Sequence, residues 1–224
     1  MMPKHKVVAF DLDDTLYKEV DFLKSAYHEI ADYLSSQYHI VDVYDEMFVY
    51  WQKGDNAFSK IIEKYDLPIQ IDDLLKMYRE HRPLMNLDEE TCQTLVLLSK
   101  TCTLGLITDG RSLTQRNKIA ALGLNLFINE GNILISEETG FAKPAQEPFA
   151  YFMKKYPNCT YFYVGDNPAK DFIAPNQFGW ETICLLDDGR NVHGQKWDDL
   201  PMPYTPHLSI TSIGKLFNIL GIDK

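Results

Sequence analysis

Three groups of polar residues follow short apolar runs in the sequence, and their side chains are of types that do chemistry together. Asp11, Asp13 and Thr15 come directly after the apolar residues 7–10. The two later groups consist of Thr108, Asp109 and Gly110, and of Asp166, Asn167 and Asp171. Neighbouring carboxylates repel one another and cannot be buried without a partner. These aspartates therefore predict a cation at the place where they meet.

A lysine in the loop GFAKPAQEPF, Lys143, would bring a positive side chain to the same place. In a parallel α/β sheet, ligands bind beyond the carboxyl ends of the strands, so polar groups that follow the strands gather at one edge. Mg²⁺ takes oxygen ligands and often bridges to phosphate in such sites. The carboxylates and the lysine together predict a Mg²⁺ site at the edge of a sheet.

The elements that would position these groups follow from the spacing of apolar residues. Apolar residues recur at helical spacing over 20–34, and no convincing strand lies between residues 15 and 101. Further helical stretches lie at 42–51, 56–65 and 71–81. Strands and helices then alternate, with strands at 102–110, 160–167 and 181–189 and helices at 113–122, 146–156 and 212–220. Such alternation implies a parallel sheet with right-handed crossovers.

The first predicted strand, residues 6–10, must join this sheet, because a single strand is not stable alone. The helical block is therefore an insertion between the first and second strands. The predicted fold class is α/β, a doubly wound parallel-sheet Rossmann-like core with an inserted all-α helical cap. The expected domains are the first part of the core at 1–16, the cap at 17–99 and the remainder of the core at 100–224.

Composition and charge exclude some classes of partner. The chain has 224 residues, enough for one large domain or a domain with an insert. Its net charge of -10 argues against nucleic acid as a partner, because binding to the phosphate backbone needs a basic surface. No run approaches the roughly 18 apolar residues of a membrane span, so no membrane partner is expected.

The start of the chain and its cysteines indicate the compartment. The first ten residues hold only a short apolar run, which is too short for a signal segment. The four cysteines are scattered without CxxC spacing, as is typical of reduced thiols. We expect a cytoplasmic protein that is a monomer or a small homo-oligomer.

The polar groups resemble, in order, the four motifs of the haloacid dehalogenase superfamily. The DxDxT motif is matched by Asp11-Leu12-Asp13-Asp14-Thr15, and the strand-terminal threonine by Thr108 in LITDG. Lys143 matches the motif lysine, and the segment from Gly165 to Asp171 matches GDxxxxD. The insert lies between the first and second motifs, as in members with an α-helical first cap. The 35 positions from Thr108 to Lys143 leave no room for a second cap domain.

This resemblance implies a role for each motif residue. Asp11 would be the nucleophile and a metal ligand, and Asp13 would be the general acid and base. Residues two apart in extended chain share a side, so Asp13 is expected to face the same way as Asp11. Neighbouring negative charge should then raise the pKa of Asp13 toward a useful value. Thr108 would hydrogen-bond the phosphoryl oxygens, and Lys143 would stabilise charge on the transferring group.

The resemblance also implies the residues around this centre. The expected metal ligands are Asp11, Asp13 and Asp166. Asn167 and Asp171 would support the site, with Asp171 orienting Lys143 or a water near the metal. The expected substrate-binding residues are Thr15, Asp109, Gly110 and Arg111. Three plainer interpretations stay open: Thr108 as a helix N-cap, Lys143 as a loop lysine, and Arg111 as a solvated arginine at a helix start.

The implied activity is Mg²⁺-dependent removal of phosphate from a small phosphorylated metabolite through an aspartyl-phosphate. A helical cap implies a closed pocket, which restricts substrates to sugar phosphates, nucleotides or acid phosphates. In layout the chain is similar to phosphoglycolate phosphatase, pyrimidine nucleotidase and N-acylneuraminate phosphatase members. Family dehalogenases lack the second aspartate of the first motif, so Asp13 favours phosphoryl transfer.

Two other functions stay open. One is a phosphohexomutase-type phosphotransferase, although such relatives usually carry Gly-Val where this chain has Asp14-Thr15. The other is a non-catalytic binding or regulatory protein, which the intact catalytic positions disfavour.

Overall fold

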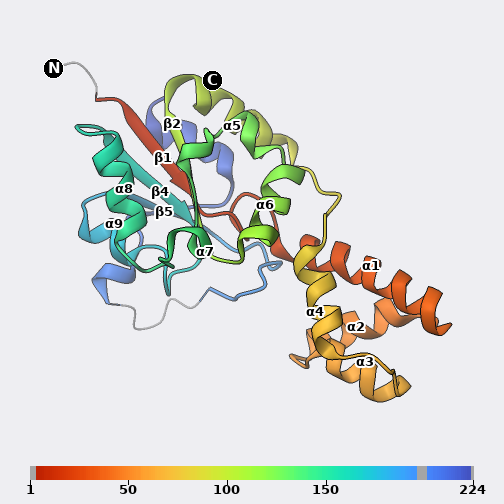
Figure 1. Ribbon diagram of the computed structural model, residues 1–224. Coiled ribbons are helices and arrows are strands. Elements are labelled where there is room, and N and C mark those ends of the chain that lie inside the picture. The colour runs from red at the N-terminus through yellow and green to blue at the C-terminus, as the bar shows by residue number, and fades with distance from the viewer. Residues whose placement is uncertain (1–3, 196–200, 223–224) are drawn as a thin grey trace.

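The computed structural model describes residues 4–195 and 201–222 and shows a sheet flanked by helices, beside a second group of helices (Figure 1). The described strands form one sheet in the order β3-β2-β1-β4-β5-β6, and every neighbouring pair is parallel. Their bounds are Lys6–Phe10 (β1), Thr103–Thr108 (β2), Ile133–Ile135 (β3), Thr160–Gly165 (β4), Glu181–Leu185 (β5) and Leu208–Ile210 (β6). The predicted α/β class with a parallel sheet is confirmed.

Strand β1 lies in the interior of the sheet because both of its faces are apolar. Val8 and Phe10 belong to the buried cluster on one face, whereas Val7 and Ala9 belong to the cluster on the other. In the sheet, β1 lies between β2 and β4, so the carboxyl ends of these three strands are neighbours. The polar residues that follow the three strands therefore meet at one edge, as predicted.

Most of the chain between β1 and β2 forms a helical lobe, which lies beside the sheet in Figure 1. Its helices are α1 (Glu19–Tyr38), α2 (Val43–Gln52), α3 (Ala57–Tyr65) and α4 (Ile71–Glu80), and they share an apolar cluster of their own. Local signals set their ends: the side chain of Asn56, for example, accepts a hydrogen bond from the backbone N–H of Ser59 and begins α3.

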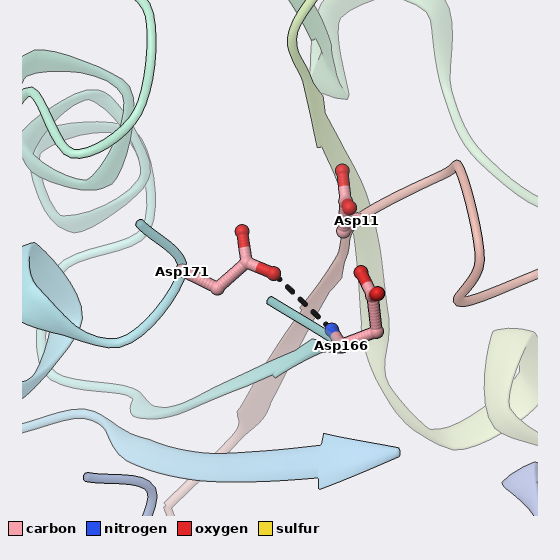
Figure 2. Close-up of side chains that lie close together, drawn as sticks. All are labelled: Asp11, Asp166 and Asp171. Atoms are coloured by element: carbon pink, nitrogen blue, oxygen red, sulfur yellow. Dashed lines mark hydrogen bonds between the residues drawn. The ribbon is translucent and has the colours of Figure 1, made fainter. Parts of the chain in front are cut away.

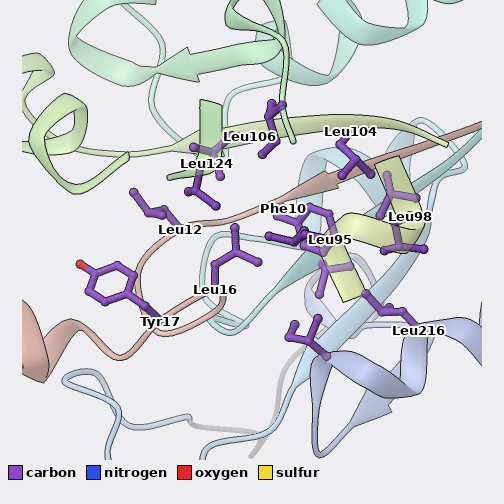
Figure 3. Packing of buried hydrophobic residues seen from close by; sticks show 14 of the residues in the cluster. Phe10, Leu12, Leu16, Tyr17, Leu95, Leu98, Leu104, Leu106, Leu124 and Leu216 are labelled. Atoms are coloured by element: carbon purple, nitrogen blue, oxygen red, sulfur yellow. The ribbon is translucent and has the colours of Figure 1, made fainter. Parts of the chain in front are cut away.

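Helix α5 (Glu89–Thr101) packs on the sheet rather than on the helical lobe. Its residues Leu95 and Leu98 are fully buried in the same cluster as side chains of β1 and β2, as Figure 3 shows. The predicted cap, 17–99, includes most of this helix. The division of the chain into domains stays a prediction, and the packing favours a cap that ends before α5.

Helices cover both faces of the sheet. After β2 the helices are α6 (Ser112–Ala121), α7 (Ser136–Thr139), α8 (Glu147–Lys155), α9 (Ile173–Gln177) and α10 (Leu216–Leu220). Single 3₁₀ turns lie at Leu124–Leu126, Glu130–Asn132, Met202–Tyr204 and Ile213–Lys215. On one face, Phe149 and Phe152 of α8 pack edge-on against Trp180. On the other, Leu216 of α10 joins the cluster that contains α5. Among these described helices, none is both long enough and apolar enough to span a membrane.

Helix α6 lies between the sheet and the helical lobe (Figure 1). The side chain of Thr114 donates to the backbone oxygen of Arg79 at 2.8 Å. The side-chain amide of Asn117 donates to the backbone oxygens of Glu80 at 3.1 Å and His81 at 3.0 Å. The last carbonyls of a helix have no partner within that helix. Helix α6 supplies partners to the end of α4, so a helix that packs on the sheet also holds the last turn of the lobe.

The packing of α5 generates a stability prediction. Replacement of Leu98 by alanine should lower the free energy of unfolding by about 2–5 kcal/mol, because it leaves a cavity in the cluster on the sheet. Leu126 is 82% exposed, so Leu126→Ala is the matched control and should change stability by less than about 0.5 kcal/mol. Urea unfolding monitored by circular dichroism measures both. Equal losses for the two variants would contradict the packing of α5 described above.

Candidate active site

Three buried carboxylates meet at the carboxyl edge of the sheet, where Figure 2 shows them pointing toward a common space. Asp11 follows β1, Asp166 follows β4, and Asp171 lies in the next turn. One oxygen from each lies within 4.8 Å of the others, and all three side chains are buried. Burial raises the pKa of Asp166 to about 9, and the charges of Asp11 and Asp171 add to this shift. Burial likewise raises the pKa of Asp11 to about 7, against the opposing charge of Lys143.

Lys143 is the cation that lies directly in this cluster. Its fully buried ammonium lies 2.6 Å from Oδ1 of Asp11 and 2.7 Å from Oδ1 of Asp171. It also donates to the hydroxyl of Tyr163 at 3.1 Å. Burial alone would lower the pKa of Lys143, but the two carboxylates hold it well above its usual range. The backbone N–H of Lys143 donates to Asp109 at 3.0 Å, which fixes the loop.

Asp171 is held in place by both of its oxygens. Oδ2 accepts from the backbone N–H groups of Asp166 at 3.1 Å and Asn167 at 2.8 Å, while Oδ1 faces Lys143. A Cβ at Gly165 would lie 2.5 Å from Oδ2 of Asp171. The glycine of the GDxxxxD motif is therefore needed for this close approach. Since the oxygens of Asp171 are occupied, Asp11 and Asp166 are the better placed ligands for a metal ion.

The side chain of Asp13 lies outside the carboxylate cluster. Its Oδ1 lies 2.6 Å from Nζ of Lys118 and also accepts from the hydroxyl of Tyr17, while its Oδ2 accepts from Gln115 at 2.9 Å. Burial raises the pKa of Asp13, but Lys118 and these hydrogen bonds outweigh burial and leave the pKa below its usual value. The expected raised pKa is therefore wrong for this arrangement, because a cation that the motifs do not include neutralises the carboxylate.

The predicted substrate-binding residues differ in whether they reach the cavity at the cluster. Asp109 lines the cavity at the cluster and pairs with Lys170 at 3.2 Å. Arg111 is half exposed and lies 3.8 Å from Glu137, away from the cavity lining. Thr15 is buried, and its hydroxyl has no hydrogen-bond partner within the described residues. Of these predicted residues, only Asp109 is brought to the cavity.

The cavity beside the cluster has a volume of about 170 Å³. Its lining is acidic because six carboxylate residues contribute to it: Asp11, Asp13, Asp14, Glu19, Asp109 and Asp166. Burial, and then the charge of Asp13, raise the pKa of Glu19 to about 7. Lys170 and His193 also line the cavity. His193 is exposed.

Sequence reasoning missed several of these neighbours. Lys170 lies inside the GDxxxxD motif, directly before Asp171. This position in the motif could have indicated that Lys170 lies near the site. Gln115 and Lys118 stand three positions apart, so they share a face of the helix that follows Thr108. Nothing in the sequence indicates that Glu19 would face the aspartates.

The family is decided by a comparison over most of the chain. Residues 8–185 match the family model described as haloacid dehalogenase-like hydrolase. The chain belongs to this family. The resemblance predicted from the four motifs is thereby confirmed.

Curated relatives within the haloacid dehalogenase-like hydrolases cover nearly the whole chain. A protein of Methanocaldococcus jannaschii named glyceraldehyde 3-phosphate phosphatase is 28% identical over 96% of both chains. A protein of the same name from Methanothermobacter thermautotrophicus is 26% identical over 84% of both chains. In structure, the HAD-hydrolase YfnB of Bacillus subtilis, solved with bound magnesium, gives a TM-score of 0.65 at 21% identity, over 98% of this chain and 100% of that one. The last comparison shows the shared fold.

The buried position of Lys143 generates a prediction with two readouts. Lys143→Met should lower turnover by at least about a hundredfold, because it removes a positive charge from the reacting centre. It should also lower the free energy of unfolding by about 3–5 kcal/mol, because Asp11 and Asp171 lose their buried cation. Steady-state kinetics and urea unfolding measure the two effects.

The matched control is Lys170→Met. The side chain of Lys170 is 34% exposed and pairs with the partly exposed Asp109, so its removal should cost less than about 1 kcal/mol of stability. Turnover of Lys143→Met within about threefold of the wild type would place the essential cation elsewhere, with Lys170 as the first residue to test.

Proposed function

We propose that this chain is a Mg²⁺-dependent phosphatase that removes phosphate from a small phosphorylated metabolite through an aspartyl-phosphate on Asp11. The observation that carries the proposal is the buried Asp11 carboxylate, 2.6 Å from Lys143 and grouped with Asp166. A nucleophilic carboxylate needs nearby positive charge, because it must approach an anionic phosphate. The names of the two archaeal relatives support a phosphatase rather than a dehalogenase.

The donor set at the sheet edge fits a magnesium ion. Asp11 and Asp166 would hold it, since each has a carboxylate oxygen that is not bound to a described cation or amide. Hard oxygen ligands of this kind suit Mg²⁺, and the burial that raises both pKa values favours a divalent cation beside them. When bound, the ion would supply positive charge that offsets the charge of the phosphoryl group. The predicted third ligand, Asp13, does not offer its carboxylate there.

The residues of the chain would then divide the reaction in two steps. In the first, an oxygen of Asp11 attacks phosphorus and the bond to the leaving alcohol breaks, while Lys143 and Thr108 stabilise the phosphoryl oxygens. In the second, water attacks the phosphorus of the aspartyl-phosphate and Asp11 is released. Asp13 would protonate the leaving alcohol in the first step and accept a proton from water in the second. Its contacts with Lys118 and Gln115 favour the carboxylate, which is the form that the second step needs. The first step needs the protonated form, so the ion pair with Lys118 must loosen for Asp13 to carry the proton that it gains from water in the preceding turnover.

Glyceraldehyde 3-phosphate is the first substrate to test, because it is named for both archaeal relatives. It is also a small molecule, in keeping with the cavity of about 170 Å³ beside the cluster. No observation among the described residues favours the mutase or the non-catalytic alternative.

The carboxylate of Asp14 accepts hydrogen bonds from the backbone N–H groups of Glu19 at 2.9 Å and Val192 at 2.8 Å, so it serves to hold the loop. The cytoplasmic location and the monomeric or small homo-oligomeric state stay predictions.

Removal of the metal provides a direct test. Turnover should disappear in excess EDTA, return with Mg²⁺ and return poorly with Ca²⁺, which prefers more ligands and longer bonds. Mg²⁺ should also raise the melting temperature of the wild type, since a ligand of the folded state stabilises it. Asp166→Asn should lose most of that increase. Full activity in EDTA would rule out the metal dependence.

The two roles of Asp13 can be separated with Asp13→Asn. An alkyl phosphate should react very slowly with this variant, because an alkoxide leaves badly without a proton. An activated aryl phosphate needs little help in the first step, so it should still phosphorylate Asp11. The second step then lacks its base, and about one aryl group per active site should appear in a burst before turnover stalls. Rapid-quench kinetics measures the burst.

Asp11→Asn is the control for this experiment and should show no burst. Circular dichroism of Asp13→Asn must show a folded protein, because the variant leaves Lys118 without its carboxylate partner. If Asp13→Asn slows both substrate types equally and gives no burst, the nucleophile and the proton donor must be reassigned.

A further inference from the structure

Gln115 of α6 is a buried amide that joins two groups of the proposed active site. Its side chain is almost inaccessible, with 2% of the residue exposed. Its Nε2 lies 2.9 Å from Oδ2 of Asp13 and 2.6 Å from Oγ1 of Thr108. Asp13 comes from the loop after β1, and Thr108 ends β2. One side chain therefore connects the ends of two neighbouring strands.

The carboxylate of Asp13 determines which way the amide of Gln115 points. An ionised carboxylate only accepts hydrogen bonds, and Asp13 is paired with Lys118 at 2.6 Å. The NH₂ group of Gln115 must therefore face Asp13, since the amide oxygen would be repelled there. The same nitrogen is then also the atom that faces Thr108.

This orientation sets the direction of the Thr108 hydroxyl. Its oxygen accepts from Gln115, so its own proton remains to be donated to another group. Within the described part of the chain, no other hydrogen bond of this hydroxyl is present. A phosphoryl oxygen accepts hydrogen bonds and donates none when ionised. Gln115 thus leaves Thr108 as a donor, which is the state that an incoming phosphate requires.

The turn after Thr108 is shaped to admit Gln115. Gly110 has a φ of +146°, and a Cβ there would lie 3.0 Å from Cδ of Gln115. Only glycine combines this backbone conformation with so close a neighbour. Gly110 makes room for the amide that contacts Thr108, and its role in binding substrate stays a prediction.

We propose that Gln115 is a positioning residue for phosphoryl transfer, which holds Asp13 beside Thr108 and directs the Thr108 hydroxyl toward the phosphoryl group. The inference rests on the proposed function, because it assigns a role in that reaction. It predicts that Gln115 contributes to the binding of phosphate through Thr108, and not through the general stability of the fold.

The experiment compares Gln115→Met and Gln115→Glu with the wild type. Methionine has a similar shape but no hydrogen-bond donor, so it keeps the packing against Gly110 without the contacts to Asp13 and Thr108. Gln115→Met should weaken the binding of inorganic phosphate in Mg²⁺ by about three- to tenfold, measured by calorimetry. It should lower kcat on an alkyl phosphate by about 10- to 100-fold with a smaller change in KM. Gln115→Glu should be impaired at least as strongly, because it sets a second carboxylate against Asp13.

The control substitution is Gln93→Met on α5. Gln93 is exposed and its amide donates only to Glu89 within the described chain, so phosphate binding and kcat should both stay at the wild-type values. A double-mutant cycle with Thr108→Val then tests the route. If Gln115 acts through Thr108, Gln115→Met should have no further effect on phosphate binding in the Thr108→Val background.

Phosphate binding and kcat of Gln115→Met both within twofold of the wild type would overturn the inference. So would equal losses of phosphate binding with and without the Thr108 hydroxyl, since the effect would then be structural. A wild type that binds phosphate but hydrolyses no phosphomonoester would refute the proposed function. The double-mutant cycle with Thr108→Val, measured by phosphate binding, would still decide whether Gln115 acts through Thr108. A wild type that binds no phosphate in Mg²⁺ would refute both.

Discussion

The contact of Lys143 with Asp11 and Asp171 is the interaction on which the rest of the structure depends. Its ammonium is completely buried, and a charge removed from water is costly unless opposite charges lie in direct contact with it. The distances of 2.6 and 2.7 Å provide that contact. The fold must therefore bring the end of β1, the turn after β4 and a distant loop within reach of one side chain. The neighbouring positions of β1 and β4 in the sheet meet this requirement.

The same constraint explains why the two aspartates of the first motif are treated differently. Between them, Leu12 turns into the apolar cluster on the sheet and is fully buried there (Figure 3). Asp13 then faces Lys118 rather than the cluster around Asp11. Asp11 thus pairs with Lys143, and Asp13 pairs with Lys118. These two ion pairs offset the repulsion between two carboxylates that are close in sequence.

Much of the fold and part of the candidate site could be predicted from the sequence. Apolar runs that end in polar residues indicate parallel strands, and the ends of such strands meet whatever their side chains do. This is why Asp11 and Asp166 could be placed together. The side chain of Asp13 could not be placed, because its direction is decided by Lys118 and Gln115, which reach it from a helix about a hundred positions further along the chain. Similarly, the absence of a strand before residue 102 placed α5 in the predicted cap, and the sequence did not indicate that α5 packs on the sheet.

The position of α6 has a consequence for how this architecture can change. One side of the helix holds Asp13 and Thr108 through Gln115, and the other holds the end of α4 through Thr114 and Asn117. The helical lobe is therefore not an interchangeable module joined only by its two linkers. The carbonyls at the end of a lobe from another protein would not be positioned to accept hydrogen bonds from Thr114 and Asn117 of α6. A resulting shift of α6 would move Gln115 and so displace Asp13 and Thr108. Exchange of the lobe of this chain, by recombination or in the laboratory, would therefore preserve these contacts only if α6 were carried along with the lobe.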